Sequence, residues 1–302
     1  MHKVFATAPG KVNLALRVGP PRTDSFHPLD TVFEAVDVYE SVSATFDRSE
    51  ISVTMSGKGQ DLPTDEQNLA VKAAMALRAS FGGSDGVHLE IDKRIPVAGG
   101  MAGGSADAAA TLVACNELWE LEASADELLE IAASIGSDVP FALMGGLAHG
   151  VGRGERLVPI NADVHHYWVM ITAADGLSTP AVFGEFDQMM GYRPVAEALV
   201  PDTRDLQRAL AAGNASEIAS LLINDLEEPA FSLRPGLRAL YKAVKSRGMA
   251  AILSGSGPTV AVLAESKGAA VQLAKELAAE HPDAGIVRAN GPVAGARVTE
   301  VI

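Results

Sequence analysis

Apolar residues alternate with polar ones, or gather in short runs, along the first part of the chain. These patterns predict strands over 4–8, 14–18, 31–38 and 42–46, and another over 87–91. A period of two is typical of a strand with one buried face, and a short apolar run is typical of a strand buried on both faces.

Two segments have the sequence of a helix N-terminal capping box. Thr64-Asp65-Glu66-Gln67 predicts a helix with Thr64 as N-cap that ends at Gly82-Gly83. Ser124-Ala125-Asp126-Glu127 predicts a second helix, whose apolar stripe of Leu128, Ile131 and Ile135 stops before Gly136. Strands interspersed with helices, several in hairpin-like succession, favour an α+β fold over a doubly wound sheet.

The second half of the chain predicts a similar mixture of elements after a glycine-rich passage at 145–155, which we place near a domain junction. A strand is expected at 167–172, a loop at 176–180 and a linker at 192–202. The remaining predicted elements are helices at 206–212, 217–222, 236–246 and 268–279, and a strand–turn–strand unit at 250–263.

Charge and length restrict the function classes. The 302 residues are enough for two domains of ordinary size. A net charge of −14 argues against nucleic acid or an anionic membrane as the main partner. An anionic ligand therefore needs local backbone donors and a few placed cations.

The single cysteine and the N-terminus bear on the compartment. Cys115 shares helical spacing with Leu112 and Trp119, which predicts a buried thiol, and one cysteine cannot form an internal disulfide. The first residues lack signal-peptide architecture, and charged residues interrupt every apolar run before it could span a membrane. We expect a cytoplasmic protein.

A glycine-rich segment lies between the strand predicted at 87–91 and an alanine-rich helix predicted from about Asp107. Its sequence is Pro96-Val97-Ala98-Gly99-Gly100-Met101-Ala102-Gly103-Gly104-Ser105-Ala106. Backbone N–H groups that lead into a helix N-terminus bind anions, and glycine lets a polyanion approach the main chain. A flexible surface turn is the alternative, but the strand–loop–helix context favours a phosphate cradle. The segment matches neither the P-loop nor the dinucleotide fingerprint.

Two charged residues are candidates for chemistry. Lys11 shares strand parity with Asn13, so both can project to one face; taken alone, the pattern favours an exposed edge lysine over a cation placed above a site. Asp138 follows the helix stop at Gly136 and precedes Pro140, which suits the first turn of a new helix. Asp138 can be a helix cap, a catalytic carboxylate, or both.

Two loops complete the set of candidates. Leu253-Ser254-Gly255-Ser256-Gly257-Pro258-Thr259-Val260 is a glycine-rich turn between apolar strands, either a plain hairpin or a site wall that faces a phosphate. In Asp24-Ser25-Phe26-His27, the aromatic and imidazole rings either stack on a flat ligand or fold back onto the core.

Three of these segments, in this order, resemble the motifs of the GHMP kinases, which phosphorylate small metabolites. They are Pro9-Gly10-Lys11-Val12-Asn13-Leu14, Pro96 through Ala110, and Leu253 through Val260. The resemblance implies a two-domain α+β fold. Its N-terminal, ATP-binding domain (1–155) is similar to ribosomal protein S5 domain 2, its C-terminal domain (156–302) is ferredoxin-like, and the active site lies between them.

Further segments resemble the members of this family that act on a cytidine diphosphate derivative. They are Ile91-Asp92-Lys93-Arg94-Ile95-Pro96, Gly136-Ser137-Asp138-Val139-Pro140-Phe141 and Asn68-Leu69. Ser25 and Phe26 depart from the usual glycine and tyrosine, which keeps an aromatic ring but loses a hydroxyl. Ser105-Ala106 stands where many relatives have two serines, so a serine that helps to hold magnesium in some relatives is either absent here or its role falls to Ser105.

The resemblance implies transfer of the γ-phosphoryl group of ATP, with Mg²⁺, to the 2-hydroxyl of 4-diphosphocytidyl-2-C-methyl-D-erythritol. Asp138 would deprotonate this hydroxyl and Lys11 would stabilise the developing charge. Asn68 would lie on the adenine side. The ATP phosphates would be cradled by Pro96, Val97, Ala98, Gly99, Gly100, Met101, Ala102, Gly103, Gly104, Ser105 and Ala106.

The acceptor would be bound from both halves of the chain. Asn13 and His27 would hold it, with His27 near the cytosine, while Phe26 and Phe183 would sandwich the base and Thr179 would line the pocket. Two alternatives stay open: another family specificity, such as homoserine or mevalonate kinase, and a relative that binds a metabolite without catalysis.

Overall fold

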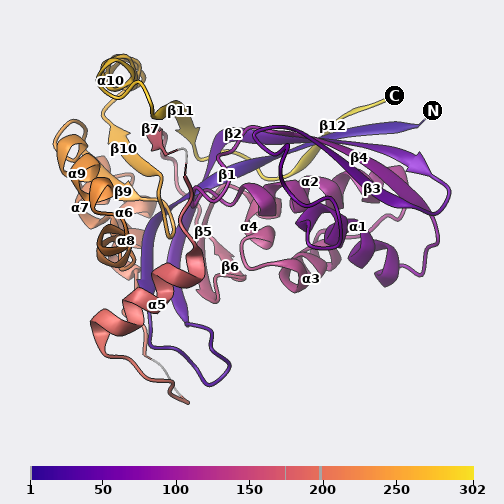
Figure 1. The fold of residues 1–302 in the computed structure, drawn as a ribbon, viewed down its shortest axis with the longest axis horizontal. Helices are drawn as coiled ribbons and strands as arrows, with labels where there is room; N and C mark the ends of the chain where they lie inside the picture. The colour runs from indigo at the N-terminus through magenta and orange to yellow at the C-terminus, as the bar shows by residue number, and fades with distance from the viewer. Residues whose placement is uncertain (1, 174, 197–198) are drawn as a thin grey trace.

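Two β-sheets with helices packed against them organise the chain (Figure 1). We describe them from a computed structural model, which covers residues 2–173, 175–196 and 199–302. The strands are β1 (Lys3–Val18), β2 (Leu29–Asp47), β3 (Ile51–Gly57), β4 (Gly86–Lys93), β5 (Leu147–Gly152), β6 (Arg156–Pro159), β7 (His166–Thr172), β8 (Ile223–Asn224), β9 (Ala250–Leu253), β10 (Val260–Ala264), β11 (Gly285–Gly291) and β12 (Arg297–Val301). The helices are α1 (Leu69–Ser80), α2 (Gly103–Leu118), α3 (Ala125–Ile135), α4 (Val139–Met144), α5 (Thr179–Met190), α6 (Arg204–Ala212), α7 (Ala215–Leu221), α8 (Glu227–Leu233), α9 (Pro235–Val244) and α10 (Lys267–Glu280).

The first sheet has the order β12-β1-β2-β4-β3, and β5 extends it from the other end of β2. Its two long strands correct the prediction: 4–8 and 14–18 belong to one strand, and 31–38 and 42–46 to another. The β1–β2 register shifts at Pro9/Gly10 and again at Asn13/Ala15. Such bulges let a strand continue through residues that would otherwise end it, and they re-aim the side chains next to them.

Helices α1 to α4 lie on one side of this sheet (Figure 1). The alanine-rich α2 packs against both β1 and β2, because its small side chains let the backbones approach closely. It begins at Gly103, earlier than predicted, so the last residues of the glycine-rich segment form its first turn.

The two capping predictions have different outcomes. The Ser124 capping box is present at the start of α3, which stops at Gly136 as predicted. The Thr64 box is wrong: the N-cap of α1 is Asn68, whose side-chain oxygen accepts a hydrogen bond from Ala70 N. Asp65 instead accepts from Gln67 N, which closes a turn before the helix begins.

The second sheet is antiparallel with the order β11-β7-β10-β9. Numbered along the chain, the order is four-one-three-two, which is the ferredoxin-like arrangement that the resemblance implies. The strand–turn–strand unit and the helices α6, α7, α9 and α10 follow the prediction closely. Sequence patterns missed α5, α8, β3, β6, β11 and β12, and β5 lies within the passage predicted as turns.

The two halves of the chain are tied together by buried polar contacts and shared strands. Glu34 on β2 accepts hydrogen bonds from His166 Nδ1 at 2.5 Å and from Trp168 Nε1 at 3.0 Å, both on β7. The last strand, β12, returns to pair with β1, which places the two termini side by side (Figure 1). The division at residues 155 and 156 stays a prediction.

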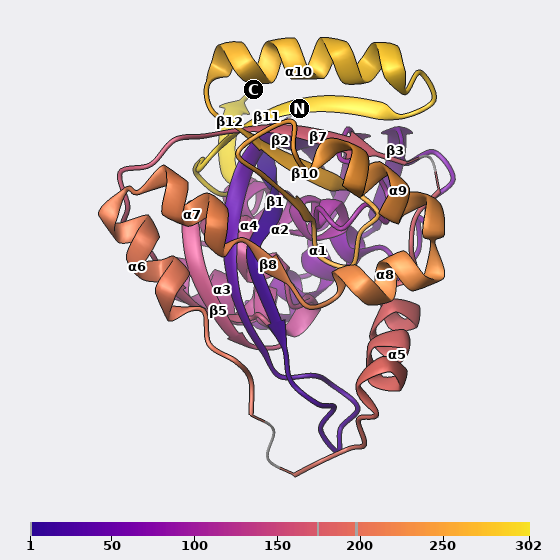
Figure 2. The same cartoon turned by 90° about the vertical axis from the view of Figure 1, so that its left-hand side faces the viewer.

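The β1–β2 ribbon projects beyond the body of the molecule, with α5 beside the loop that joins the two strands (Figure 2). This placement brings a loop of the first half against a helix of the second. Within the described residues, no helix is long and apolar enough to cross a membrane. Cys115 is buried in α2 as predicted, and burial raises the pKa of its thiol.

Candidate active site

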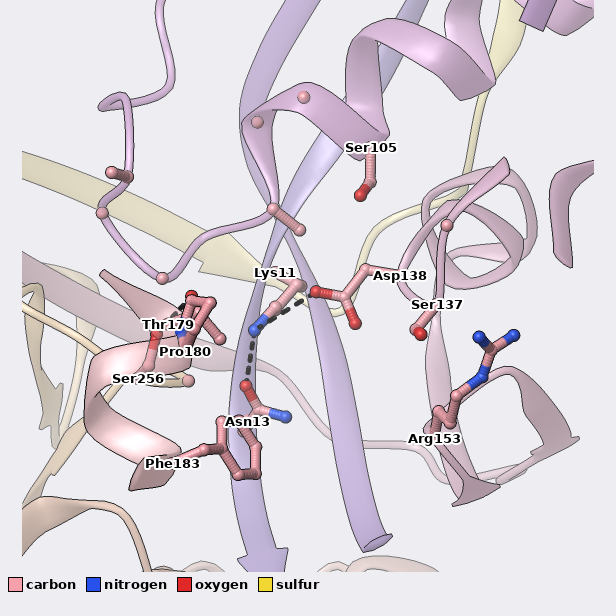
Figure 3. Close-up of a pocket in the computed structure, with 18 of the residues that line it drawn as sticks. Lys11, Asn13, Ser105, Ser137, Asp138, Arg153, Thr179, Pro180, Phe183 and Ser256 are labelled. Atoms are coloured by element: carbon pink, nitrogen blue, oxygen red, sulfur yellow. Dashed lines mark hydrogen bonds and ion pairs between the residues drawn. The ribbon is translucent and has the colours of Figure 1, made fainter. Parts of the chain in front are cut away.

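A cavity of about 870 Å³ collects most of the predicted site residues. This volume is typical of a site for a small-molecule ligand. Figure 3 shows its centre, where side chains from β1, α2, the start of α4 and α5 converge. The predicted residues that line it are Lys11, Asn13, Phe26, His27, Pro96, Val97, Ala98, Gly99, Gly100, Ala102, Gly103, Gly104, Ser105, Asp138, Thr179 and Phe183.

The glycine-rich segment forms a loop over residues 96–102 with an unusual backbone. Ala98, Gly100 and Ala102 have positive φ angles of 50°, 80° and 59°. Left-handed backbone costs an alanine about 1–2 kcal/mol, so surrounding contacts must hold the loop in this shape. Alternating backbone handedness of this kind turns successive N–H groups toward one concave side, which is the geometry of an anion-binding nest.

The second glycine-rich turn braces this loop. Ser254 Oγ donates to Gly100 O at 3.0 Å, and Thr259 N donates to Gly99 O at 3.3 Å. At Gly100 a Cβ atom would lie 1.9 Å from Ser254 O, so only glycine fits there. The turn is therefore more than a plain hairpin, since it fixes the loop and contributes Gly255 and Ser256 to the cavity wall.

The N-terminus of α2 opens directly behind the loop. Its N-cap, Ala102, makes no side-chain capping bond, and Gly103, Gly104 and Ser105 form the first turn. The N–H groups of a first turn have no acceptor within the helix, and the helix dipole adds partial positive charge. Together with the nest, this helix end provides the donor geometry that phosphate groups require.

Lys11 is a buried cation over the site, which corrects the expectation of an edge lysine. Its residue exposure is 5%. Lys11 Nζ donates to Asn13 Oδ1 at 2.6 Å and lies 3.8 Å from Asp138 Oδ2 (Figure 3). Asn13 Nδ2 in turn donates to Thr31 Oγ1 at 2.9 Å, which fixes the orientation of the amide.

Lys11 and Asp138 differ in how deeply they are buried, and this affects the pKa of Lys11. Burial lowers the pKa of the Lys11 ammonium, and the nearby Asp138 carboxylate opposes that shift. The Lys11 side chain is almost fully buried, whereas a third of the Asp138 side chain is exposed to the cavity. Asp138 can therefore contact a ligand in the cavity, while the Lys11 ammonium lies behind it in the protein interior.

Asp138 occupies the N-cap position of α4, yet its side chain makes no capping hydrogen bond. Pro140 lies in the first turn of that helix, as predicted. The capping interpretation thus explains where the residue lies in the chain but leaves the carboxylate free. A carboxylate at this position normally satisfies backbone donors, but here it faces Lys11 and the cavity, where it is available for chemistry.

Rings from both halves of the chain meet at the far side of the cavity. His27 and Phe183 lie with ring centres 4.8 Å apart and their planes tilted by 36°. His27 Nδ1 contacts Gly19 O at 2.9 Å, and Nε2 lies 3.5 Å from Asp187 Oδ2. Phe26 is 49% exposed, and the Arg153 guanidinium lies 5.0 Å from its ring centre.

Three predicted ATP-site residues lie outside the cavity lining. Asn68 caps α1 and donates to Pro63 O at 2.8 Å, so its amide serves the local fold, while the adjacent Leu69 lines the cavity. Met101 in the loop and Ala106 in α2 are buried, because both side chains pack into the hydrophobic core. Met101 O accepts a hydrogen bond from Lys11 N at 3.2 Å, which links the loop to β1.

Sequence reasoning missed several lining residues. Arg153, Asp187 and Lys93 reach the cavity from β5–β6, α5 and β4. Arg153 lies in the glycine-rich passage at 145–155, whose composition indicates a domain junction but not a site. Lys93 lies in the Ile91–Pro96 motif, which by itself predicts no role for the lysine. Ser256 lay within a recognised turn, and its hydroxyl lies 2.9 Å from Thr179 Oγ1 (Figure 3).

Comparison with known proteins defines the class. The family model described as GHMP kinases N terminal domain matches residues 68–146, and the model described as GHMP kinases C terminal matches residues 194–283. The chain belongs to the GHMP kinase family.

Individual relatives narrow the comparison. The chain is similar to 4-diphosphocytidyl-2-C-methyl-D-erythritol kinase of Leifsonia xyli, at 48% identity over 99% of both chains. It is also similar to the protein of that name in Streptomyces coelicolor, at 47% identity over 98% of this chain and 99% of the relative. A crystal structure of 4-(cytidine 5'-diphospho)-2C-methyl-D-erythritol kinase matches with a TM-score of 0.74 and 30% identity, covering 95% of this chain and 99% of that one. Homoserine kinase from Cytophaga hutchinsonii has the same fold, with a TM-score of 0.77, 20% identity and coverage of 98% and 97%.

Proposed function

We propose that this chain transfers the γ-phosphoryl group of ATP to the 2-hydroxyl of 4-diphosphocytidyl-2-C-methyl-D-erythritol, in the non-mevalonate route to isoprenoids. One observation supports it above all: a single cavity holds a phosphate loop, a Lys11–Asp138 pair and an aromatic His27–Phe183 wall. These are the parts that a kinase for a base-bearing alcohol needs. The relatives that match this chain over nearly its full length at 47–48% identity are named as kinases of this acceptor.

The ATP phosphates bind at the loop and the first turn of α2. Backbone donors from the 96–102 nest and from Gly103, Gly104 and Ser105 stabilise phosphate charge by hydrogen bonding. This arrangement suits a chain whose net charge is −14, since the attraction is local and fixed. Phosphoryl transfer depends on positioning and charge stabilisation, which rigid backbone donors supply.

Asp138 accepts the proton of the attacking hydroxyl, whose oxygen then bonds to the γ-phosphorus as the bond to ADP breaks. Lys11 lies 3.8 Å from Asp138 and stabilises negative charge that develops on the transferring group. Asn13 holds Lys11 in place through the 2.6 Å hydrogen bond and forms part of the acceptor wall.

The cytosine base occupies the aromatic end of the cavity. Phe183 offers one ring face and Phe26 the other. His27 Nδ1 is held by Gly19 O, and its Nε2 would recognise the base edge in place of the 3.5 Å contact with Asp187. Thr179, at the first position of α5, lines the same wall beside Ser256. The acceptor is thus bound by both halves of the chain.

Magnesium fits the oxygen donors at this site. Within the described residues, no group of three or more histidine, cysteine or acidic side chains comes together. Mg²⁺ in kinases needs no such group, because it is bound through one or two carboxylates, waters and the nucleotide phosphates. Ser105 presents a hydroxyl oxygen to the cavity and would hold the ion together with waters and the nucleotide phosphates, and the ion would neutralise phosphate charge.

A coupled assay for ADP tests the proposal. The purified protein is given ATP, Mg²⁺ and, separately, the cytidyl-methylerythritol acceptor, homoserine and mevalonate. We expect turnover with the first and none above background with the others. Turnover with homoserine or mevalonate would show that the chain has the substrate specificity of another GHMP kinase, and binding without turnover would favour a regulatory relative.

As an ATP-consuming enzyme, the protein would act in the cytoplasm, with neither nucleic acid nor membrane as partner.

A further inference from the structure

A buried ionic cluster lies beneath the phosphate loop, outside the groups used in the mechanism above. Its members are Glu40 on β2, Lys93 at the end of β4 and Asp107 in α2. Lys93 Nζ lies 2.7 Å from Glu40 Oε1 and 2.7 Å from Asp107 Oδ2. The three side chains are between 0% and 4% exposed. Charged groups this deep are costly to bury and are kept where their hydrogen bonds serve a specific arrangement.

Glu40 holds the N-terminal end of the loop. Its Oε2 accepts a hydrogen bond from Arg94 N at 2.8 Å, and its Oε1 accepts one from Ile95 N at 3.2 Å. These are the two backbone amides directly before Pro96, where the loop begins. A carboxylate that accepts two adjacent amides fixes the direction in which the chain enters the loop.

The same cluster reaches the C-terminal end of the loop. Lys93 bridges Glu40 to Asp107, which lies one turn into α2. A Cβ atom at Gly103 would lie 3.0 Å from Lys93 Nζ and 3.1 Å from Glu40 Oε1, so the cluster packs directly under the first residue of the helix. One buried group therefore contacts both ends of the segment that would surround the ATP phosphates.

The loop between these ends requires such support. Ala98 and Ala102 adopt left-handed backbone, which alanine avoids in a free chain. The Ser254–Thr259 turn fixes the middle of the loop, but none of its hydrogen bonds reaches the residues before Pro96 within the described chain. Contacts at the ends are needed to keep the N–H groups aimed before a ligand arrives.

We propose that Glu40 is a positioning residue for ATP, which presets the phosphate loop through the Arg94 and Ile95 amides and, through Lys93, the start of α2. The inference rests on the proposed function, because it assigns the loop to ATP. Glu40 does not line the cavity, so it acts through the backbone and not by touching the nucleotide.

Glu40→Gln tests this role, since it keeps the shape but turns an NH₂ group toward either an amide donor or Lys93. We expect the Kd and KM for ATP to rise by about tenfold or more, because a charge-assisted contact to the loop is lost. The Kd for cytidine diphosphate and the KM for the acceptor should stay within about twofold. Arg94→Ala is the matched control: it removes the exposed Arg94–Asp92 ion pair but keeps the Arg94 N–H, so both affinities should hold.

The outcomes separate the possible failures. A folded Glu40→Gln protein with normal ATP affinity, or with equal losses for both ligands, would overturn the positioning role. If the variant does not fold, hydrogen exchange in the ligand-free native protein tests whether Glu40 holds the start of the loop. Slow exchange at the Arg94 and Ile95 amides is expected, and exchange as fast as at Val97 and Ala98 would overturn the inference. A native protein that binds cytidine diphosphate but not ATP would instead refute the proposed function.

Discussion

Lys11 Nζ lies 3.8 Å from Asp138 Oδ2, across the gap between strand β1 and the start of helix α4. The ammonium is buried and the carboxylate faces the cavity, so the pair has an inner and an outer member. Asp138 can contact a substrate, while Lys11 supplies a positive charge beside it. This asymmetry leads to separate predictions for the two residues.

Asp138→Asn should lower kcat by roughly two to four orders of magnitude, because the amide cannot accept the proton of the attacking hydroxyl. The affinity for ATP should barely change, since the loop and α2 bind the phosphates. Steady-state kinetics and calorimetric titration with ATP measure the two effects.

The melting temperature supplies a control for Asp138. The side chain makes no capping bond, but Asp138→Asn removes the charge opposite the buried Lys11 ammonium, so we expect a folded variant that is less stable by about 1–3 kcal/mol. A variant that keeps near-normal kcat would show that the base lies elsewhere.

The decrease of kcat/KM at alkaline pH should follow the deprotonation of Lys11. Burial lowers its pKa below the ordinary value of 10.5, so the ammonium loses its proton at a lower pH than an exposed lysine does. We expect kcat/KM to fall on the alkaline side below pH 10.5, measured with saturating Mg²⁺. Lys72→Met, an exposed lysine on α1, should leave the profile unchanged. An activity that persists to the pH range of free lysine would contradict the role of Lys11.

Gly100 and Gly236 make a matched pair of substitutions inside and outside the phosphate loop. Gly100→Ala places a Cβ 1.9 Å from Ser254 O at a φ of 80°, so the loop must distort, and ATP affinity should fall more than about tenfold. Gly236 lies in α9, outside the cavity lining, and a Cβ there would meet no atom within 4 Å. Gly236→Ala should therefore keep ATP affinity within about twofold. Equal ATP affinities in two folded variants would argue against a phosphate cradle.

The aromatic wall should control the acceptor and not ATP. A base stacked on an aromatic side chain is worth about 1–3 kcal/mol, so Phe183→Ala and Phe26→Ala should each raise the acceptor KM roughly tenfold to a hundredfold. His27→Ala should act likewise and weaken the preference for cytidine over uridine analogues.

Phe46→Ala is the control for these rings, because Phe46 is comparably exposed at 45% but lies outside the cavity lining. Acceptor KM values that stay normal in all three ring variants would favour homoserine or mevalonate as substrate.

The buried cluster predicts an unusual pH dependence of stability. Burial raises the pKa of Asp107 from an ordinary 3.8 to about 7, with Lys93 opposing and Glu40 adding to the shift. Between these values the folded state holds a proton that the unfolded state has released, so this group's contribution to stability falls as pH rises from about 4 to 7 and is constant above.

Chemical denaturation across that pH range checks the prediction for Asp107. Asp107→Asn stays neutral and should flatten the decline, whereas Asp61→Asn, at an exposed loop position, should not. A native protein and an Asp107→Asn variant with parallel pH curves would refute it.

Local chemistry along the chain was enough to predict several parts of this molecule. The glycine density of 96–104, the Ser124 capping box and the apolar strands at 250–263 each depend on contacts between near neighbours. Backbone permissiveness, helix capping and period-two burial act over a few residues, so the sequence alone indicated the α+β class and the phosphate loop.

Other features depended on residues far apart in the sequence. Lys11 is a buried site cation and not an edge lysine because α4 brings Asp138 beside it. Asn68 caps α1 because the turn before that helix closes on Asp65, and its role on the adenine side stays a prediction. The Glu40–Lys93–Asp107 cluster joins two strands and a helix, and no local pattern marks it. Burial, pairing and strain at such sites are set by long-range packing, and only the tertiary structure decides them.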